Sequence, residues 1–178
     1  HIIKKEIKKF NFKLNIKISD DGKKLRGTGG AIKKAIKKYK DEKFFVMYGD
    51  SYLRVNLTNL QNKFINSSKK AVMTVIKNKN KWDKSNVYFE DEATIIYNKS
   101  KVSKKFDYID YGILAIKSEI FNKYPENKSF DLSSVLKNIS IKKQLEGYKV
   151  LKRFYHIGDE RNIKETSNFL RRNKNELY

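Results

Sequence analysis

Hydrophobic and polar positions along the chain follow two different periods. In residues 31–39 the apolar positions recur every three or four residues and fall on one face, which predicts an amphipathic helix. Residues 12–18, FKLNIKI, alternate apolar and polar with a period of two, which predicts a half-buried strand. The face of the helix opposite its apolar side consists of lysines that we expect to be solvated: Lys33, Lys34, Lys37 and Lys38.

Continuous apolar runs predict a second kind of strand. Residues 44–48, 71–77 and 108–116 are apolar at almost every position. Runs of this kind are typical of strands buried on both faces, as in the sheet of an α/β protein. Helical patterns lie between the runs, so we expect a single α/β domain over residues 1–178.

The same periodicities predict the remaining elements. Helices are expected at 2–10, at 57–64 after a cap by Asn56, at 117–124, at 132–138 after a cap by Asp131, and at 162–172. Two strands within 86–99 are expected around an acidic turn at Glu90 to Glu92, and a late strand at 148–155.

Composition narrows the protein classes. With 39% hydrophobic residues, the chain of 178 residues is too apolar to be disordered despite its net charge of +21. The absence of cysteine excludes disulfides, thiolate nucleophiles and cysteine-based zinc sites. No apolar run approaches the roughly 20 residues that cross a bilayer, so we expect no membrane partner and a cytoplasmic location. Basic residues, almost all lysine, are spread along the chain, so we expect no specific nucleic-acid binding, only salt-sensitive adhesion to polyanions.

A glycine-rich stretch, RGTGGAIKK, precedes the predicted helix at 31–39. It does not match the dinucleotide fingerprint, because position 32 is isoleucine where a third glycine is needed, and it lacks the Gly-Lys-Ser/Thr end of a P-loop. Backbone amides at the start of a helix favour an anion. From these residues alone, a loop that contacts a ligand and a plain turn both remain open.

Asp50 follows the apolar run 44–48 after a single glycine. Ligands of open α/β sheets bind beyond the carboxyl ends of the strands, where a carboxylate can hold a divalent cation that bridges phosphates. The alternative is that Asp50 caps a turn. Lys99 follows another predicted strand and is either a phosphate ligand or one more surface lysine.

Other candidate residues carry weaker signals. His156 is one of two histidines, and taken alone it predicts a packing or hydrogen-bonded residue. Asp107 and Asp110, like the acidic cluster at 90–92, are expected to be solvated turn residues rather than a metal site. No Ser/His/Asp arrangement is visible.

Read in order, several stretches resemble the sugar-phosphate nucleotidyltransferases, which join a nucleoside triphosphate to a sugar 1-phosphate. The matching stretches span nearly the whole chain: GTGGAI, FFVMYGDSYL, MTVIKNKNKWDKSNV, YNK, YIDYGILAIKSEIF, FDLSSVL and RFYHIGDERNIKETSNFL. WDKSN and YIDYG look closest to a bacterial branch of mannose- and heptose-1-phosphate guanylyltransferase-like proteins.

This resemblance implies a Rossmann-like three-layer α/β sandwich with a mostly parallel mixed sheet. It implies transfer of a nucleotidyl group to a sugar 1-phosphate, giving an NDP-sugar and pyrophosphate for cell-surface polysaccharide precursors. The resemblance also assigns roles to residues: Gly27, Thr28, Gly29 and Gly30 to the nucleotide, Asp50 to Mg²⁺, Lys99 to the sugar phosphate, and Gly112 to close approach of the sugar.

Two departures from the family pattern lead to further expectations. The glycine-rich signature loop, with its arginine and later Pro-Lys pair, has no counterpart here, so we expect a domain that lacks its first strand, helix and following strand and turns over weakly. His156 stands where the family usually has an acidic metal ligand, and imidazole is a poor ligand for Mg²⁺. Either Asp50 and phosphate oxygens suffice for the metal, or the position has lost its role.

Two other functions are weighed against nucleotidyl transfer. A glycosyltransferase that uses a nucleotide-sugar would want an Asp-x-Asp pair after a strand, and YGDSY offers one aspartate. A non-catalytic basic module that binds polyanions would show affinity that falls steeply with salt. The sequence predicts no oligomeric state.

Overall fold

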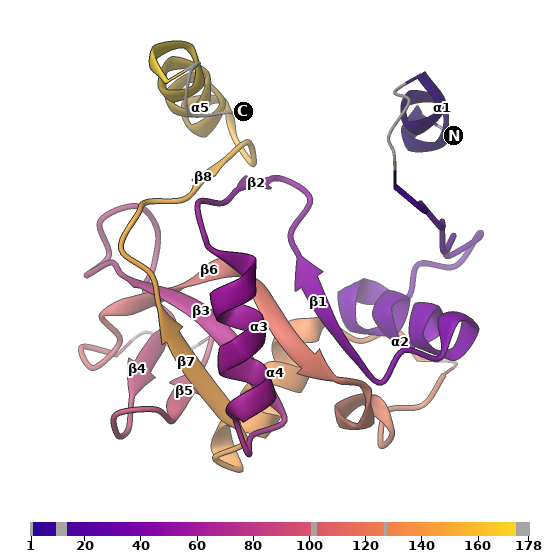
Figure 1. Cartoon of the computed structure of the whole chain (residues 1–178), viewed down its shortest axis with the longest axis horizontal. Coiled ribbons are helices and arrows are strands. Elements are labelled where there is room, and N and C mark those ends of the chain that lie inside the picture. The colour runs from indigo at the N-terminus through magenta and orange to yellow at the C-terminus, as the bar shows by residue number, and fades with distance from the viewer. Residues whose placement is uncertain (1, 10–13, 101–102, 127, 174–178) are drawn as a thin grey trace.

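A mixed six-stranded β-sheet forms the centre of the molecule (Figure 1). The computed structural model describes residues 2–9, 14–100, 103–126 and 128–173. The strands of the sheet are β1 (Lys43–Met47), β3 (Ala71–Lys77), β4 (Val87–Phe89), β5 (Ile95–Tyr97), β6 (Tyr108–Lys117) and β7 (Leu145–Lys149). A separate two-stranded ribbon consists of β2 (Ser51–Tyr52) and β8 (Tyr155–His156).

The long strand β6 organises the sheet. It pairs antiparallel with β1, β3 and β4, while β7 pairs parallel with β3 and β5 pairs antiparallel with β4. Strands β1, β3, β4 and β7 therefore run in one direction. Most pairs of neighbouring strands are nevertheless antiparallel, because β6 runs opposite to β1, β3 and β4 and pairs with all three. The predicted α/β fold with a mixed sheet is confirmed.

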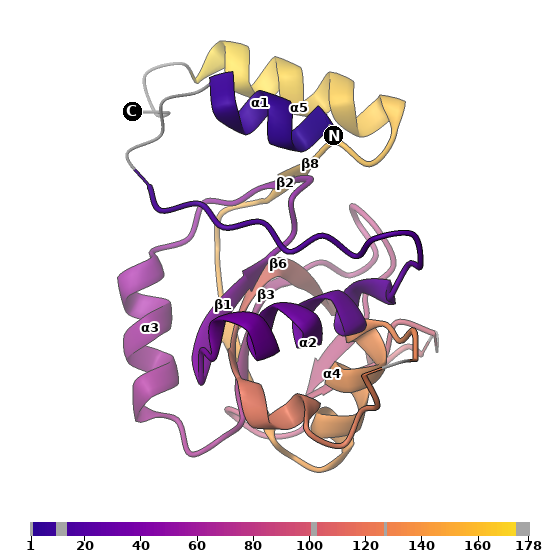
Figure 2. The ribbon, with the colours of Figure 1, turned by 90° about the vertical axis from the view of Figure 1, so that its right-hand side faces the viewer.

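Helices cover both faces of the sheet, giving three layers (Figure 2). In the described residues, the helices and a 3₁₀ turn are α1 (Ile2–Lys9), α2 (Gly27–Tyr39), α3 (Leu57–Asn66), η1 (Ser118–Phe121), α4 (Leu132–Ile141) and α5 (Glu160–Arg172). Leu60 and Phe64 of α3 belong to the apolar core on one face. Residues of α4, with Ile32 and Ile36 of α2 packed against them, belong to the core on the other face.

The apolar runs differ in how deeply they are buried. In β3 the six residues from Ala71 to Ile76 are all buried, as predicted. In β1 the prediction of burial on both faces is wrong, because the exposure alternates along the strand. Phe44 and Val46 pack against the core, whereas Phe45 and Met47 are 39% and 61% exposed. An apolar run therefore did not distinguish an outer strand from a central one.

The strand predicted at 12–18 is also wrong. Residues 12 and 13 lie outside the described part of the chain, and residues 14–18 form no strand and leave Leu14, Ile16 and Ile18 exposed. Alternation provides an apolar face, but a strand also needs a neighbour to satisfy its backbone groups. Within the described residues this segment pairs with no strand.

Three further predictions change in detail. The helix expected at 117–124 is only the 3₁₀ turn η1, and the late strand expected at 148–155 divides into β7 and β8. The lysine face of α2 is not simply solvated. The Lys33 ammonium donates to the carbonyls of Phe121 and Tyr124 at and after the end of η1, and Lys37 pairs with Glu126 at 2.8 Å.

The first predicted helix is confirmed as α1, although Phe10 of its expected apolar face lies outside the described residues. Ile2 and Ile3 of α1 are 79% and 73% exposed. In Figures 1 and 2 this helix stands apart from the sheet. Among the described residues, no helix combines the length and the apolar character needed to span a bilayer.

Candidate active site

The β2–β8 ribbon brings Asp50 beside His156, although the two residues lie far apart in the sequence. Ser51 is directly opposite His156 in the antiparallel register, and the Ile157 amide donates to the Asp50 carbonyl at 3.0 Å. Asp50 lies beyond the end of β1, where the main sheet gives way to this ribbon (Figure 1). The pairing of β2 with β8 explains why the turn after β1 lies next to the segment around His156.

The side chains of both residues flank Gly158. A Cβ atom at position 158 would lie 3.2 Å from His156 Nδ1 and 3.9 Å from Asp50 Oδ2. His156 Nδ1 accepts a hydrogen bond from the Gly158 amide at 3.3 Å, and Asp50 Oδ1 accepts one from the Ser51 hydroxyl at 3.1 Å. Asp50 is exposed, and its Oδ2 atom has no hydrogen-bond donor within the described residues.

The side chains of Asp50 and His156 suit a metal ion that takes only some of its ligands from the protein. The described chain has no group of three or more histidine and carboxylate side chains that could hold an ion. Mg²⁺ typically keeps several waters and takes one or two carboxylates together with substrate phosphates. One exposed carboxylate, Asp50, fits that arrangement, whereas the His156 nitrogen adds little for a cation that prefers oxygen.

Gly112 lies next to the turn that carries Asp50. Its φ of +101° marks a bulge in β6, where the register with β3 shifts between Met73 and Val75. A Cβ atom at position 112 would lie within 3.5 Å of Leu53, Ser51 and Tyr48. The left-handed backbone favours glycine at this position, whereas the distances to these neighbours are ordinary van der Waals contacts that a Cβ atom could make. The structure therefore places Gly112 against the residues on either side of Asp50.

A partly buried carboxylate, Asp110, lies beside Gly112 on β6, so the prediction of a solvated turn residue is wrong. The Tyr48 hydroxyl donates to Asp110 Oδ2 at 2.6 Å, and the Gly112 amide donates to Asp110 Oδ1 at 3.0 Å. Burial raises the pKa of Asp110, against the opposing effects of these two hydrogen bonds and of the nearby Lys99 charge. A charged residue inside the apolar run 108–116 was the signal that could have revealed it.

Lys99 is exposed and follows β5. Its charge opposes the rise in the pKa of Asp110, and no ion pair between the two side chains is found within the described residues. Tyr97, two residues earlier, has a pKa raised by burial and then by the Asp110 charge. Asp50 and Gly112 thus come from two separate segments that meet at Tyr48, and the charge of Lys99, from a third segment, acts on the neighbouring Asp110.

The glycine-rich stretch packs against the loop before α4. Gly29 and Gly30 donate their amides to the Phe130 carbonyl at 3.0 and 3.2 Å, and Thr28 Oγ1 accepts from the Leu132 amide at 2.9 Å. Thr28 therefore caps α4, a role that no sequence pattern indicated; Asp131 at the N-cap makes no side-chain capping bond. Two of the amides expected to face an anion are occupied within the protein.

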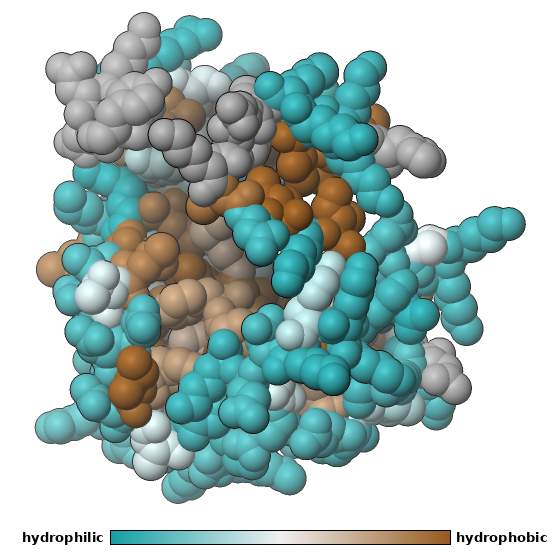
Figure 3. Space-filling view, turned by 45° about the vertical axis from the view of Figure 1, so that its right-hand side comes forward, coloured by the Kyte–Doolittle hydropathy of each residue, from teal (hydrophilic) through white to brown (hydrophobic). Residues whose placement is uncertain are grey.

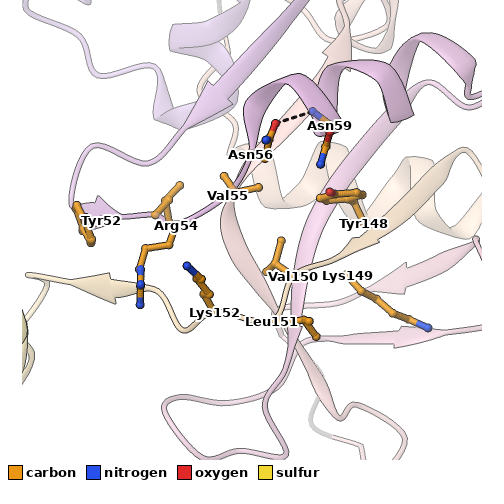
Figure 4. A pocket seen from close by; sticks show the side chains of 11 residues that line it. Tyr52, Arg54, Val55, Asn56, Asn59, Tyr148, Lys149, Val150, Leu151 and Lys152 are labelled. Carbon is orange, nitrogen blue, oxygen red and sulfur yellow. Dashed lines mark hydrogen bonds between the residues drawn. The ribbon is translucent and has the colours of Figure 1, made fainter. Parts of the chain in front are cut away.

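A separate cavity of about 760 Å³ lies between the start of α3 and the end of β7 (Figure 4). None of Asp50, Lys99, Gly112 and His156 lines it. Lys149 points away from the other labelled side chains, with its ammonium 4.3 Å from the centre of the Phe89 ring. This cavity is distinct from the place where the predicted site residues meet.

Comparisons with known proteins identify relatives of the chain. The chain is 31% identical over 152 residues to D-glycero-alpha-D-manno-heptose 1-phosphate guanylyltransferase of Campylobacter jejuni subsp. jejuni, a match that covers 85% of this chain and 62% of that protein. The chain thus spans less than two thirds of the length of this curated relative.

Two solved structures share the fold. HddC from Yersinia pseudotuberculosis has a TM-score of 0.70 at 21% identity, with 95% of this chain and 73% of that chain covered. The same protein complexed with GMP-PN has a TM-score of 0.67 at 22% identity, with 94% and 73% covered. The family model described as nucleotidyl transferase matches residues 1–170, which contain the turn with Asp50, the bulge at Gly112 and the β2–β8 ribbon. On that match the chain belongs to the nucleotidyl transferase family.

Proposed function

We propose that the chain serves the transfer of a nucleotidyl group from a nucleoside triphosphate to a sugar 1-phosphate, which yields an NDP-sugar and pyrophosphate for cell-surface polysaccharide precursors. The observation that carries the proposal is the position of Asp50 and Gly112, from two segments, on either side of Tyr48 at one end of the sheet, where the charge of Lys99 acts on Asp110. Family membership and the heptose 1-phosphate guanylyltransferase relative support it. Nucleoside triphosphates are cytoplasmic metabolites, so the proposal includes a cytoplasmic location.

Each segment has a part in binding. Lys99 holds the phosphate of the sugar 1-phosphate by its charge, and the glycine backbone at position 112 lets the sugar approach β6 closely. Gly27 and Thr28 contact the nucleotide. Because the amides of Gly29 and Gly30 already donate to Phe130, we place the contact at the first two amides of α2 instead.

The reaction is an in-line displacement at phosphorus. An oxygen of the sugar 1-phosphate forms a bond to the α-phosphorus while the bond to the oxygen that bridges the α- and β-phosphates breaks, and its electron pair leaves with pyrophosphate. The contribution of this chain is positioning, since Lys99 and the backbone around Gly112 fix the attacking phosphate. Asp50 is the residue that would hold Mg²⁺, with His156 at its side. A bound Mg²⁺ screens the repulsion between the two phosphate groups and stabilises the transition state.

Binding of a sugar 1-phosphate tests the proposal most directly. α-D-mannose 1-phosphate is titrated into the chain at about 0.15 M salt, where exposed charges are screened beyond about 8 Å. We expect saturable binding, no binding of mannose, and an affinity at least about tenfold lower for Lys99→Ala. Lys137→Ala is the control, because it removes the same charge from an exposed position on α4.

The outcomes separate the candidate functions. Equal losses for the two lysine variants would contradict the proposal and favour general adhesion to anions, which falls steeply with salt. Binding of a nucleotide-sugar without binding of the sugar 1-phosphate would favour a glycosyltransferase.

For the metal, Asp50→Asn is expected to remove the Mg²⁺ dependence of GTP binding, whereas Asp41→Asn, an exposed aspartate before β1, leaves it unchanged.

A further inference from the structure

Three hydrogen bonds join residues 48, 110 and 112 in a closed ring. The Tyr48 amide donates to the Gly112 carbonyl at 2.9 Å, the Gly112 amide donates to Asp110 Oδ1 at 3.0 Å, and the Tyr48 hydroxyl donates to Asp110 Oδ2 at 2.6 Å. Tyr48 directly follows β1 and Asp110 lies on β6. The ring therefore ties the end of one strand to the bulge of its neighbour.

The ring also satisfies the backbone groups that the bulge releases. A bulge removes local ladder bonds and leaves polar groups that are costly if buried without partners. The Asp110 carboxylate accepts the hydrogen bond of the Gly112 amide, and the Tyr48 amide donates to the Gly112 carbonyl. The buried Thr74 hydroxyl donates to the Ile113 carbonyl at 2.5 Å. Asp110 is held in turn by its own amide, which donates to the side chain of Asn86 at 3.0 Å.

The charge of Asp110 acts on the third segment of the site. Burial raises the pKa of Asp110, and among the described residues Lys99 is the cation whose charge opposes that rise. The other titratable groups facing this carboxylate are the phenols of Tyr48 and Tyr97, both of which have pKa values raised first by burial and then by Asp110. Lys99 and Asp110 form no ion pair within the described residues, so the charge of Lys99 acts on this carboxylate without direct contact.

From this network we infer that Asp110 is a positioning residue, which locks the turn carrying Asp50 onto the Gly112 bulge and orients the Lys99 ammonium for the phosphate of a sugar 1-phosphate. The inference rests on the proposed function for the ligand, and on the hydrogen-bond ring for the geometry. Asp110 touches neither the substrate nor the reacting atoms in this role.

A double-mutant cycle on the full chain tests the inference. Asp110→Asn keeps the size of the side chain and removes its charge, and it is measured alone and together with Lys99→Ala. α-D-mannose 1-phosphate is titrated by NMR, which follows dissociation constants into the range of about tens of millimolar, so the weakened variants stay measurable. Asp107→Asn is the matched control, because it makes the same change three residues earlier at a side chain for which no hydrogen bond or ion pair is found in the described chain. The rate of hydrogen exchange at the Gly112 amide measures whether the hydrogen-bond ring is intact in the absence of ligand.

If the inference holds, Asp110→Asn weakens binding about tenfold when Lys99 is present and less than about twofold when Lys99 is replaced. The Gly112 amide then exchanges faster in Asp110→Asn, and Asp107→Asn behaves as the unmodified chain. An equal loss in both backgrounds, or no loss, overturns the positioning role while the proposed function stands. Failure of the unmodified chain to bind mannose 1-phosphate overturns the proposed function and this role with it.

Discussion

Two glycines adopt the same left-handed backbone in different surroundings. Gly22 has a φ of +75°, and a Cβ atom added there would have nothing within 4 Å. Gly27 has a φ of +69°, and a Cβ atom there would lie 2.6 Å from the Phe130 carbonyl oxygen. Left-handed strain alone costs about 1–2 kcal/mol for a residue with a side chain. The difference in stability loss between substitutions at the two sites therefore measures the effect of the close packing of Gly27 on the loop before α4.

We expect Gly22→Ala to lower the free energy of unfolding by about 1 kcal/mol, from strain alone. Gly27→Ala should lower it by a further 1–3 kcal/mol, roughly, because the added methyl group forces the loop away. Denaturant unfolding of both variants measures the difference. Equal losses would show that Gly27 is needed only for its backbone angle.

At the same scale, sequence patterns indicated some residues of the proposed site and missed others. Asp50 was singled out because a carboxylate one residue after an apolar run lies where α/β proteins bind ligands, and its role as a metal ligand stays a prediction. Asp110 was assigned to a solvated turn, because its partner Tyr48 lies 62 positions away and no local pattern announces that contact. The closeness of Asp50 and His156 likewise depends on β2–β8 pairing, since two-residue strands carry no periodicity.

Among the secondary-structure elements, helices were predicted better than the environments of strands. The cap at Asn56 is confirmed, and its Oδ1 atom accepts from the Asn59 amide at 2.9 Å. Helix signals are local, because the capping residue and the apolar face both lie within the element. The exposure of β1 and the absence of a strand at 14–18 depend on neighbours, which a period of two does not specify.

The cap of α3 gives a prediction at this scale. Asn56→Ala removes the acceptor for an amide in the first turn and should lower the free energy of unfolding by about 1 kcal/mol. Asn62→Ala, at an exposed position inside the same helix, should be neutral or slightly stabilising because alanine has the higher helix propensity. Thermal or denaturant unfolding of both variants checks this. A loss at position 62 as large as that at 56 would argue against a specific cap.

On the scale of the whole molecule, a large positive charge and an exposed apolar surface have opposite effects on self-association. The net charge of +21 makes copies of the chain repel one another, and salt screens that repulsion. Figure 3 looks toward the side of the molecule that carries β1, where apolar residues surround a hollow. Within the described residues β1 pairs only with β6, so its other edge has free backbone groups next to Phe45 and Met47.

An exposed apolar edge strand is a site of self-association, and native proteins often protect such an edge with lysine. We therefore expect the average mass in solution to rise above 21.1 kDa with protein concentration when salt is raised from about 0.02 M to about 0.5 M, as screening shortens the range of repulsion. Met47→Lys should suppress that rise. Ile65→Lys, at a position of α3 that is 60% exposed compared with 61% for Met47, adds the same charge away from the edge. Light scattering or sedimentation distinguishes the two variants. If both suppress association equally, net charge alone controls it and the β1 edge has no special part, because the two substitutions match in charge and exposure and differ only in place.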